Sequence, residues 1–460
     1  MEVRDPIHGF IELDEHEVRL INHASFQRLH HIHQLAMAYL VYPGATHTRF
    51  EHSLGVCHIA GMLADVVGLR PEQRQRVRLA SLLHDIGHGP FSHVAELILV
   101  ACNEGLPVGE VEEFHERIGL QVTRRLHRAG VIAHSLEGIE NVLVPGALGA
   151  TGPRHEQDRP PVRNVCRDIV SGPLDADKMD YLLRDSYYAG VQYGIYDLHR
   201  LAHAATTIEE RPNSYLGVRE EDVPAVDQFI IANHNMRIQV YGHRIRRVTD
   251  LMLVRSVVEA IREGNEDARL LFTYEESDAF LDRYMAVDDA ELVRLVMSGP
   301  DGAGKELMSR LVTRRLPKDV LTVPLDEIAD AELAERLHTK DAEAEAVHGL
   351  ETRLAEHLGL RPPDRVLVEV RPDRPVLKTK GEAVVDTADI RVKLPDGRQG
   401  SYDQISRFFR KGGLADRDHV CVWVTIDEHD RERRDVERAN LRRLALEVLP
   451  IGEEHGHGQA

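Results

Sequence analysis

LLHDIGHGPFSH, at residues 82–93, joins a His-Asp pair to a turn that contains two glycines and a proline. The pair, His84 and Asp85, lies at the end of a helical pattern over residues 70–86 and follows apolar leucines, which predicts that it faces a protein core. Burying an imidazole beside a carboxylate costs free energy unless a cation or hydrogen bonds compensate. The pair is therefore a candidate for binding a metal ion.

Helical patterns extend on both sides of this stretch. Apolar residues recur at helical spacing over residues 46–67, 91–102, 110–129, 166–188 and 223–263. Four prolines and three glycines within residues 144–164 predict a loop. After residue 361 short β-rich runs begin, at residues 366–370, 390–394 and 420–426. A last helical pattern covers residues 435–449.

These patterns predict a mainly α fold, with a helical catalytic core and a small C-terminal α/β appendage. The length of 460 residues exceeds that of one typical domain. The predicted parts are a core over residues 1–263, a helical extension over 264–361, a small α/β subdomain over 362–451 and a flexible tail over 452–460.

Composition narrows the function classes. The chain has 57 basic and 76 acidic residues and a formal net charge of −19, so nucleic acid is not expected as its main partner. No apolar run approaches the ~18 residues of a membrane helix, and the sequence starts without a basic and apolar leader. The four cysteines are scattered without a CxxC pair, as in reduced proteins. We predict a cytoplasmic protein without a membrane partner.

Histidines and acids gather in a few short fragments. The chain has 27 histidines, many of them in its first 135 residues. Besides residues 82–93, the fragments are RFEH at 49–52, FHE at 114–116 and DADKMDY at 175–181. Metal sites draw imidazole and carboxylate ligands from separate elements, and so complete a set is difficult to explain by packing alone. The sequence therefore predicts a metal centre.

The fragment at 175–181 lies in a predicted helix and adds a geometric argument. Asp177, Tyr181 and Asp185 are spaced four residues apart, so all three project from one helix face. That face offers a carboxylate, then an aromatic hydroxyl, then a second carboxylate. This order could follow a nucleotide from its phosphates to its sugar.

The combined motifs resemble the HD-domain metal-dependent phosphohydrolases, in their deoxynucleoside triphosphate (dNTP) triphosphohydrolase branch. The resemblance rests on LLHDIGHGPFSH together with DPIHG at 5–9, FQRL at 26–29, YPGATHTRFEHSLGV at 42–56 and DADKMDYLLRD at 175–185. It is dense over residues 3–200 and thinner to about residue 255. Animal members carry an N-terminal SAM domain, which is not expected here because DPIHG begins at residue 5.

The resemblance implies a role for each matching position. The implied ligands of a divalent metal ion (Mn, Mg, Fe, Zn, Ni or Co) are His52, His84, Asp85 and Asp177. The implied catalytic residues are His88, His93 and His115, with the nearby carboxylates Glu96 and Glu116. The implied substrate-binding residues are Arg49 and Lys178 for the triphosphate, Tyr181 between phosphates and sugar, Gln34 and Asp185 for the sugar 3′-hydroxyl, and Leu35 and Tyr241 for the sugar face.

The expected reaction converts a dNTP into a deoxynucleoside and inorganic triphosphate. A divalent cation with Arg49 and Lys178 would neutralise the phosphate charge, and a metal-activated water would attack the α-phosphorus. His93 is the favoured proton donor to the departing 5′-oxygen.

Some positions depart from the family pattern. A phosphate-binding arginine of the animal members falls on Asn233, and the glutamine after the family's tyrosine is Gly242. Gln27 and Arg28 match the family's guanine-nucleotide activating site, whereas Asn22 and His30 do not, so the need for a nucleotide activator stays open. The resemblance also implies a homo-oligomer, a dimer or a tetramer.

Two other interpretations remain. An HD-type phosphohydrolase or phosphodiesterase could act on other nucleotides, a nucleotide signal or DNA ends, and the change at Asn233 favours this alternative. A nucleotide-sensing or scaffold protein is the third interpretation, but a protein that only binds has no need of four metal ligands. The preferred base, the metal and the role of residues 265–460 are not fixed by the sequence, and nucleotide-pool balance and phage defence are equally open as pathways.

Overall fold

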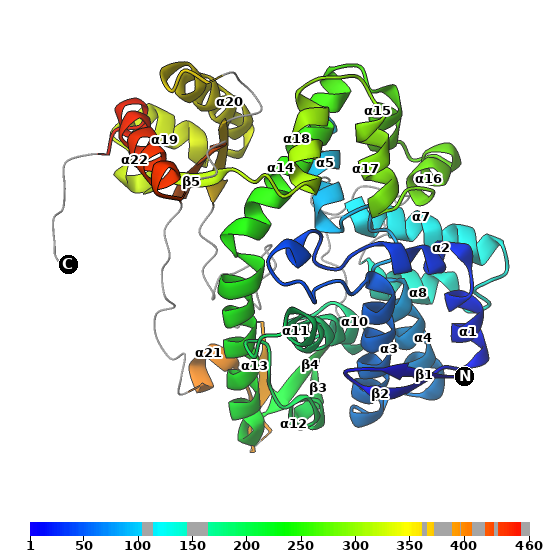
Figure 1. Ribbon diagram of the computed structural model, residues 1–460. Helices are drawn as coiled ribbons and strands as arrows, with labels where there is room; N and C mark the ends of the chain where they lie inside the picture. Colours follow the sequence, from blue (N-terminus) through cyan, green and yellow to red (C-terminus); the bar gives the residue numbers. More distant parts are fainter. Residues whose placement is uncertain are drawn as a thin grey trace, which may run out of the picture. The chain divides into compact units, whose positions relative to one another are not determined.

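The computed structural model describes residues 1–103, 114–144, 164–360, 366–371, 389–395, 397–406, 419–426 and 431–451. Most of the loop predicted at 144–164 and the tail predicted at 452–460 lie outside these ranges. The described residues are mainly helical with small sheets, which confirms the predicted fold class (Figure 1). No helix among them is both long and apolar enough to cross a membrane.

The chain divides into two compact units. The first comprises Met1–Arg247, Glu266–Leu295 and Val376–Gly412, and the second comprises Val248–Asn265, Val296–Pro375 and Gly413–Ala460. Each unit therefore combines segments that are distant in sequence.

The described part of the first unit is mainly helical. They are α1 (Glu15–Ile21), α2 (Ala24–Gln27), α3 (Arg49–Val66), α4 (Pro71–Leu83), α5 (His93–Cys102), α7 (Phe114–Arg128), α8 (Leu136–Leu143), α10 (Val165–Val170), α11 (Ala176–Ala189), α12 (Leu198–Ala204), α13 (Val223–Met236), α15 (Glu266–Phe272), α16 (Asp278–Met285), α17 (Asp289–Met297) and α21 (Tyr402–Ile405). Short 3₁₀ turns lie at Arg28–His31, Ala38–Leu40 and Glu220–Asp222, and a π-helical turn lies at Arg237–Tyr241.

The first unit also holds two small sheets. An N-terminal hairpin pairs β1 (Glu2–Asp5) with β2 (Gly9–Glu12). The second sheet has the order β3-β4-β7-β8, with β3 at Ala205–Glu210, β4 at Asn213–Arg219, β7 at Arg391–Lys393 and β8 at Gln399–Ser401. β7 runs parallel to β4, so a segment from the C-terminal part of the chain completes a sheet of the first unit.

Helix α3 is the centre of the first unit. It packs between α4 and α11, and most of its residues are buried (Figure 1). Such a helix must be apolar on most sides, as Leu54, Val56 and Ile59 illustrate. Its first turn carries Arg49 and His52, which are also buried, so the core positions polar groups of the candidate site.

The second unit is built on a three-stranded antiparallel sheet. Its order is β5-β9-β6, with β5 at Lys318–Pro324, β9 at His419–Val424 and β6 at Val366–Arg371. Its helices are α14 (Arg244–Arg262, which starts in the first unit), α18 (Ala303–Val312), α19 (Ala331–His338), α20 (Lys340–His357) and α22 (Arg431–Val448), and a 3₁₀ turn lies at Leu325–Glu327. Valines of the strands and leucines of α19, α20 and α22 form one hydrophobic core.

Three local predictions differ from the structure. The segment predicted as helical at 264–361 contains strand β5, whose β-branched residues pair with β9. The helix predicted at 223–263 is interrupted by the π-helical turn and by Gly242, a poor helix former. The β-rich runs predicted as one α/β subdomain are divided between two sheets, because β7 joins β4 whereas β6 joins β9.

A buried ion pair links α1 to α4 and tests this core. Arg78 donates to both carboxylate oxygens of Glu17, at 2.6 and 2.8 Å, and both side chains are buried. Arg78→Met should lower the free energy of unfolding by about 3–5 kcal/mol, because it leaves Glu17 buried without its partner. Chemical denaturation measures the change. The matched control is Arg74→Met, which breaks an exposed pair with Asp65 and should cost less than about 1 kcal/mol; equal effects of the two changes would contradict the assignment.

Candidate active site

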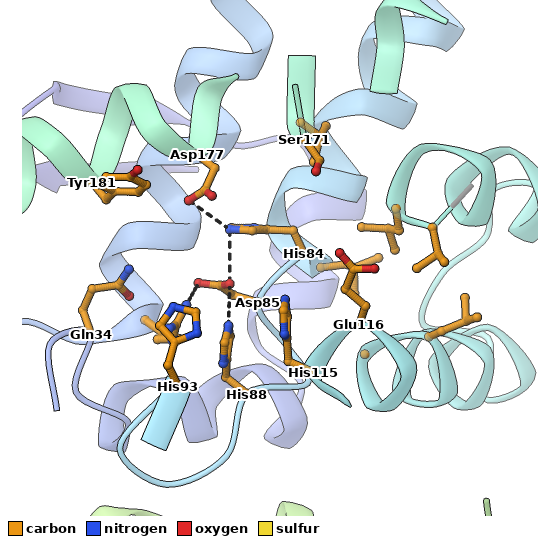
Figure 2. A pocket seen from close by; sticks show the side chains of 17 residues that line it. Gln34, His84, Asp85, His88, His93, His115, Glu116, Ser171, Asp177 and Tyr181 are labelled. Carbon is orange, nitrogen blue, oxygen red and sulfur yellow. Dashed lines mark hydrogen bonds and ion pairs between the residues drawn. The ribbon is translucent and has the colours of Figure 1, made fainter. Parts of the chain in front are cut away.

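A pocket in the first unit collects many of the residues predicted from sequence. Figure 2 shows His84, Asp85 and Asp177 facing one another, with His88 and His115 next to them. The predicted site residues that line the pocket are Gln34, Arg49, His84, Asp85, His88, His93, His115, Glu116, Asp177 and Tyr181. Gln34 comes from the turn segment before α3, and the others come from α3, the end of α4 and the loop after it, α5, α7 and α11, so segments distant in sequence converge here.

Two imidazoles are oriented by hydrogen bonds from their far nitrogens. His52 Nδ1 donates to Asp180 Oδ2 at 2.8 Å, and His84 Nδ1 donates to the Ser81 carbonyl at 2.6 Å. In metal sites such bonds fix the ring and leave the other nitrogen for the metal. The Nε2 atom of His52 lies 3.0 Å from Asp177 Oδ1, and that of His84 lies 3.3 Å from Asp85 Oδ1.

These groups fit a divalent cation. One ligand atom from each of His52, His84 and Asp85 lies within 4.8 Å of the others, and Asp177 Oδ1 approaches both imidazoles. His84 Nε2 is buried and has no hydrogen-bond partner among the described residues. Burial alone would lower the pKa of His52, but Asp177 and Asp180 raise it to about 10. The carboxylates therefore attract positive charge to the Nε2 position, where a cation would replace the proton.

Asp85, a member of this cluster, also pairs with a buried arginine. Arg49 donates from Nη1 to Asp85 Oδ2 and from Nε to the Ser92 hydroxyl, the latter at 2.8 Å. Burial opposes ionisation of Asp85, but the Arg49 guanidinium and the neighbouring imidazoles hold the pKa of its carboxyl well below the usual range. Arg49 Nη2 has no hydrogen-bond partner among the described residues, which leaves it available to an anion in the pocket.

A second group of imidazoles shares one carboxylate. Glu96 accepts from His93 Nδ1 at 3.0 Å and from His115 Nδ1. The rings of His88 and His115 stack with centroids 4.3 Å apart, and His88 Nε2 lies 3.3 Å from Asp85 Oδ1. Burial alone would lower the pKa of His115, but Glu96 raises it. By contrast, burial and the charges of Arg49 and His115 hold the pKa of His88 well below its ordinary value.

The glycines after Asp85 let the loop pack closely. A Cβ at Gly87 would lie 2.1 Å from the His115 carbonyl oxygen, and one at Gly89 would lie 2.2 Å from the Tyr284 hydroxyl. Neither position has room for a side chain without displacement of its neighbours. The two glycines therefore allow the loop that carries His88 to lie directly against α7 and α16.

Helix α11 contributes less to the pocket than its sequence spacing predicts. Asp177 and Tyr181 line the pocket, whereas Asp185 is buried behind it, 2.7 Å from His47 Nε2 and 2.6 Å from the Tyr241 hydroxyl. Lys178 is not among the lining residues, and its ammonium donates to Asp175 Oδ2 at 2.6 Å. Leu35 is buried and also lies outside the lining.

Sequence reasoning missed the residues that support His52. Asp180 accepts from His52, from His8 Nε2 at 2.6 Å and from Arg184, and Arg184 also donates to Asp5 at 2.8 Å. The available signal was the spacing of Asp180 and Arg184 at i and i+4 on α11, with Asp180 three residues after Asp177, so that both carboxylates reach the same His52 ring. The same contacts give the DPIHG motif a structural role, because this turn supplies Asp5 to Arg184 and His8 to Asp180.

Arg28, which matches the family pattern, and His30 and Asn233, which depart from it, all have local partners. Arg28 donates from Nη1 to the His88 carbonyl at 2.8 Å and from Nε to the Val287 carbonyl at 3.2 Å, so its guanidinium is engaged inside the protein. His30 stacks on Phe50 with centroids 3.6 Å apart. Asn233 donates to the Tyr181 hydroxyl at 3.3 Å.

The fold and the pocket define a helical protein with a candidate divalent-cation site. The model of the HD domain matches residues 49–161, and that of the HD-associated region matches residues 196–396. An uncharacterized protein of Methanocaldococcus jannaschii is 32% identical over 78% of this chain and 67% of its own length. The chain therefore belongs to the HD-domain superfamily of phosphohydrolases, which confirms the resemblance inferred from the motifs.

Two further relatives extend the comparison. The deoxynucleoside triphosphate triphosphohydrolase SAMHD1 of Danio rerio is 28% identical over 69% of this chain, which spans only 54% of that protein. A solved structure of a hypothetical protein from Aquifex aeolicus has a TM-score of 0.67 at 27% identity, and the match covers 96% of this chain and 99% of that one. The likeness to the Aquifex protein thus extends over nearly the whole chain.

The role of Asp180 can be tested through metal binding. Asp180→Asn should weaken Mn²⁺ binding about 10- to 100-fold, because an amide no longer fixes the His52 ring as the carboxylate does. Isothermal titration of metal-free protein measures the dissociation constant. Asp197→Asn is the matched control, because Asp197 caps α12 and does not line the pocket. Unchanged Mn²⁺ affinity in a folded Asp180→Asn protein would refute the supporting role of Asp180.

Proposed function

We propose that the protein hydrolyses dNTPs to a deoxynucleoside and inorganic triphosphate. The observation that carries this proposal is the convergence of His52, His84, Asp85 and Asp177 beside a pocket that also holds Arg49. The similarity to SAMHD1 of Danio rerio, a deoxynucleoside triphosphate triphosphohydrolase, supports the substrate class. A dNTP is the proposed substrate, and a homo-oligomer and a cytoplasmic location belong to the same proposal.

Each polar group of the pocket has a task in this reaction. A divalent cation held by His52, His84, Asp85 and Asp177 would neutralise phosphate charge and make a bound water acidic. Arg49 would bind a phosphate oxygen through Nη2 while its Nη1 and Nε stay on Asp85 and Ser92. Because those bonds fix the guanidinium before substrate arrives, little reorganisation is needed.

His93 is the proposed proton donor to the 5′-oxygen. Its side chain is 62% exposed, lines the pocket and donates from Nδ1 to Glu96, which leaves Nε2 for the leaving group. His115 shares the same carboxylate and stacks on His88, so it would hold that group in place. Glu116 also lines the pocket, close to this group of histidines.

The sugar would lie near Tyr181 and Gln34, which line the pocket. Gln34 Oε1 is buried and has no hydrogen-bond partner among the described residues, so it could accept from the 3′-hydroxyl. Asp185, Leu35 and Tyr241 would act from behind this surface, since they do not line it. Lys178 would have to exchange Asp175 for a phosphate.

A second candidate is a phosphohydrolase or phosphodiesterase that acts on a less charged nucleotide. Among the described residues that line the pocket, Arg49 is the one permanently charged cation. Asn233 and Lys178 are engaged with Tyr181 and Asp175. A substrate with fewer phosphate charges than a triphosphate would need fewer cations.

Product analysis separates the two candidates. Purified protein with Mn²⁺ or Mg²⁺ should convert dNTPs into deoxynucleoside and triphosphate, which ion-exchange chromatography resolves for each of the eight dNTPs and NTPs. His84→Ala and Asp85→Ala should each abolish turnover, because each removes a proposed ligand of the cation. A chelator should do the same, because it removes the cation itself. Glu266→Ala, at an exposed pair with Arg269, should keep wild-type activity. Failure to hydrolyse any of the eight triphosphates, together with turnover of a nucleotide that carries fewer phosphate charges, would favour the second candidate.

The shared carboxylate predicts a pH effect. Glu96 raises the pKa of His115, so the protonated imidazole persists to higher pH in the wild type than it would without that charge. Because protonated His115 bonds the carboxylate that also holds the proposed donor His93, Glu96→Gln should lower the turnover rate and move the alkaline limb of the pH–rate profile to lower pH. The profile of kcat measured from pH 5 to 10 tests this shift. An alkaline limb at the wild-type pH would show that Glu96 does not control the titration.

A further inference from the structure

We propose that Asp289 is a positioning residue, whose carboxylate holds the loop between Asp85 and His93 in its active conformation. This inference rests on the proposed function, because it concerns how the catalytic loop is held for that reaction. Asp289 is the first residue of α17, about 200 residues after the loop in sequence. It does not line the pocket and belongs to none of the motifs.

The carboxylate of Asp289 joins two segments that border the pocket. Its Oδ1 accepts from the backbone N–H of Phe91 at 2.6 Å. Its Oδ2 accepts from the backbone N–H of His33 at 3.0 Å and from His33 Nδ1 at 2.6 Å. The Asp289 side chain is 7% exposed, so water competes little for these bonds. Three donors on one buried carboxylate make a charge-assisted clamp.

The clamped loop has an unfavourable backbone conformation. Phe91 and Ser92 both have φ of 59°, in the left-handed region that residues other than glycine rarely adopt. Two such residues in succession persist only where the surroundings enforce them. The bond from Phe91 N–H to Asp289 is made at one of the two strained residues, and that bond would be lost if the backbone relaxed.

The strained turn leads directly to the proposed catalytic groups. The Ser92 hydroxyl donates to the His33 carbonyl at 2.6 Å and accepts from Arg49 Nε at 2.8 Å. Arg49 in turn holds Asp85, and His93 follows Ser92 in the chain. Asp289 therefore holds two segments that position the Ser92 hydroxyl: the backbone at Phe91, which precedes Ser92, and the His33 segment, whose carbonyl accepts from that hydroxyl. The orientation of Arg49 and the place of His93 depend on that hydroxyl and backbone.

A second side chain reinforces the same connection. Arg28 donates from Nη1 to the His88 carbonyl at 2.8 Å and from Nη2 to the Val287 carbonyl at 3.1 Å. The segment that ends at Asp289 is therefore bonded to the loop at its beginning, through Arg28, and near its end, through Phe91. This double connection explains why a segment outside the sequence motifs would control the geometry of the pocket.

The decisive variant is Asp289→Asn, which keeps the size of the side chain but replaces one acceptor oxygen by an amide donor. It cannot accept both the Phe91 and the His33 N–H groups. We expect kcat on dNTPs to fall roughly 10- to 100-fold, as a small displacement of catalytic groups does. Bound Mn²⁺ per folded protein should stay within about two-fold, since Asp289 contacts none of the four proposed metal ligands. Glu291→Gln, on the exposed face of α17, is the matched control and should keep wild-type kcat.

A double-mutant cycle distinguishes positioning from a merely structural role. If Asp289 acts through the loop, Asp289→Asn should cost much less in a Ser92→Ala background, because the contact from Ser92 to Arg49 is already lost. Equal fold-losses in both backgrounds would overturn the proposal. So would a wild-type kcat in folded, metal-loaded Asp289→Asn protein.

Hydrogen exchange keeps this test separate from the proposed function. In Asp289→Asn the amides of residues 88, 89 and 91–93 should exchange at least ten-fold faster than in the wild type, while those of α3 keep their rates. If the wild type leaves every dNTP intact, the proposed function fails, and kcat is then compared on whichever nucleotide the wild type hydrolyses. Wild-type exchange of the loop in Asp289→Asn would overturn the clamp whatever the substrate.

Discussion

The carboxylates of Asp85 and Asp177 face the same small volume in a largely buried pocket, and their negative charge must be compensated there. Two imidazoles and the guanidinium of Arg49 supply part of the compensation. The raised pKa of His52 shows that the carboxylates still attract positive charge, since burial alone would make this imidazole lose its proton easily. A divalent cation would meet this demand better than protons do, because one cation can bind two carboxylates and two imidazoles at once.

Support for this arrangement comes from three directions. Helix α11 presents two neighbouring carboxylates to the His52 ring, Asp177 to Nε2 at the pocket and Asp180 to Nδ1. The N-terminal hairpin reaches Asp180 through His8, and the strained loop after Asp85 is bonded to α17. The pocket is thus held by segments that are far apart in sequence. Because several distant segments bond to the same groups, the pocket can keep strained backbone and buried charges in place.

The helical fold class and the gathering of residues around His84 could be predicted from the sequence, because both depend on patterns within short stretches of the chain. A His-Asp pair at the end of an apolar helix, and Asp177 with Tyr181 on one face of another, follow from helical spacing alone. The same spacing failed for Asp185, which faces His47 and Tyr241 rather than the pocket, since a helix face is wider than a pocket wall. Lys178 pairs with Asp175 at its own helix start, a local contact that competes with a ligand.

Other features could not be read from the sequence because they depend on tertiary contacts. The bond of Asp289 to Phe91 joins residues 198 positions apart, and nothing near Asp289 signals it. The pairing of β7 with β4, and of β6 with β9, likewise depends on which sheet edge is available in the folded protein.

The central claim, that His52, His84, Asp85 and Asp177 hold one divalent cation, is tested most directly by anomalous diffraction from crystals grown with Mn²⁺. The account predicts one strong peak about 2 Å from an atom of each of the four side chains. A peak elsewhere, or none at these atoms, would contradict it.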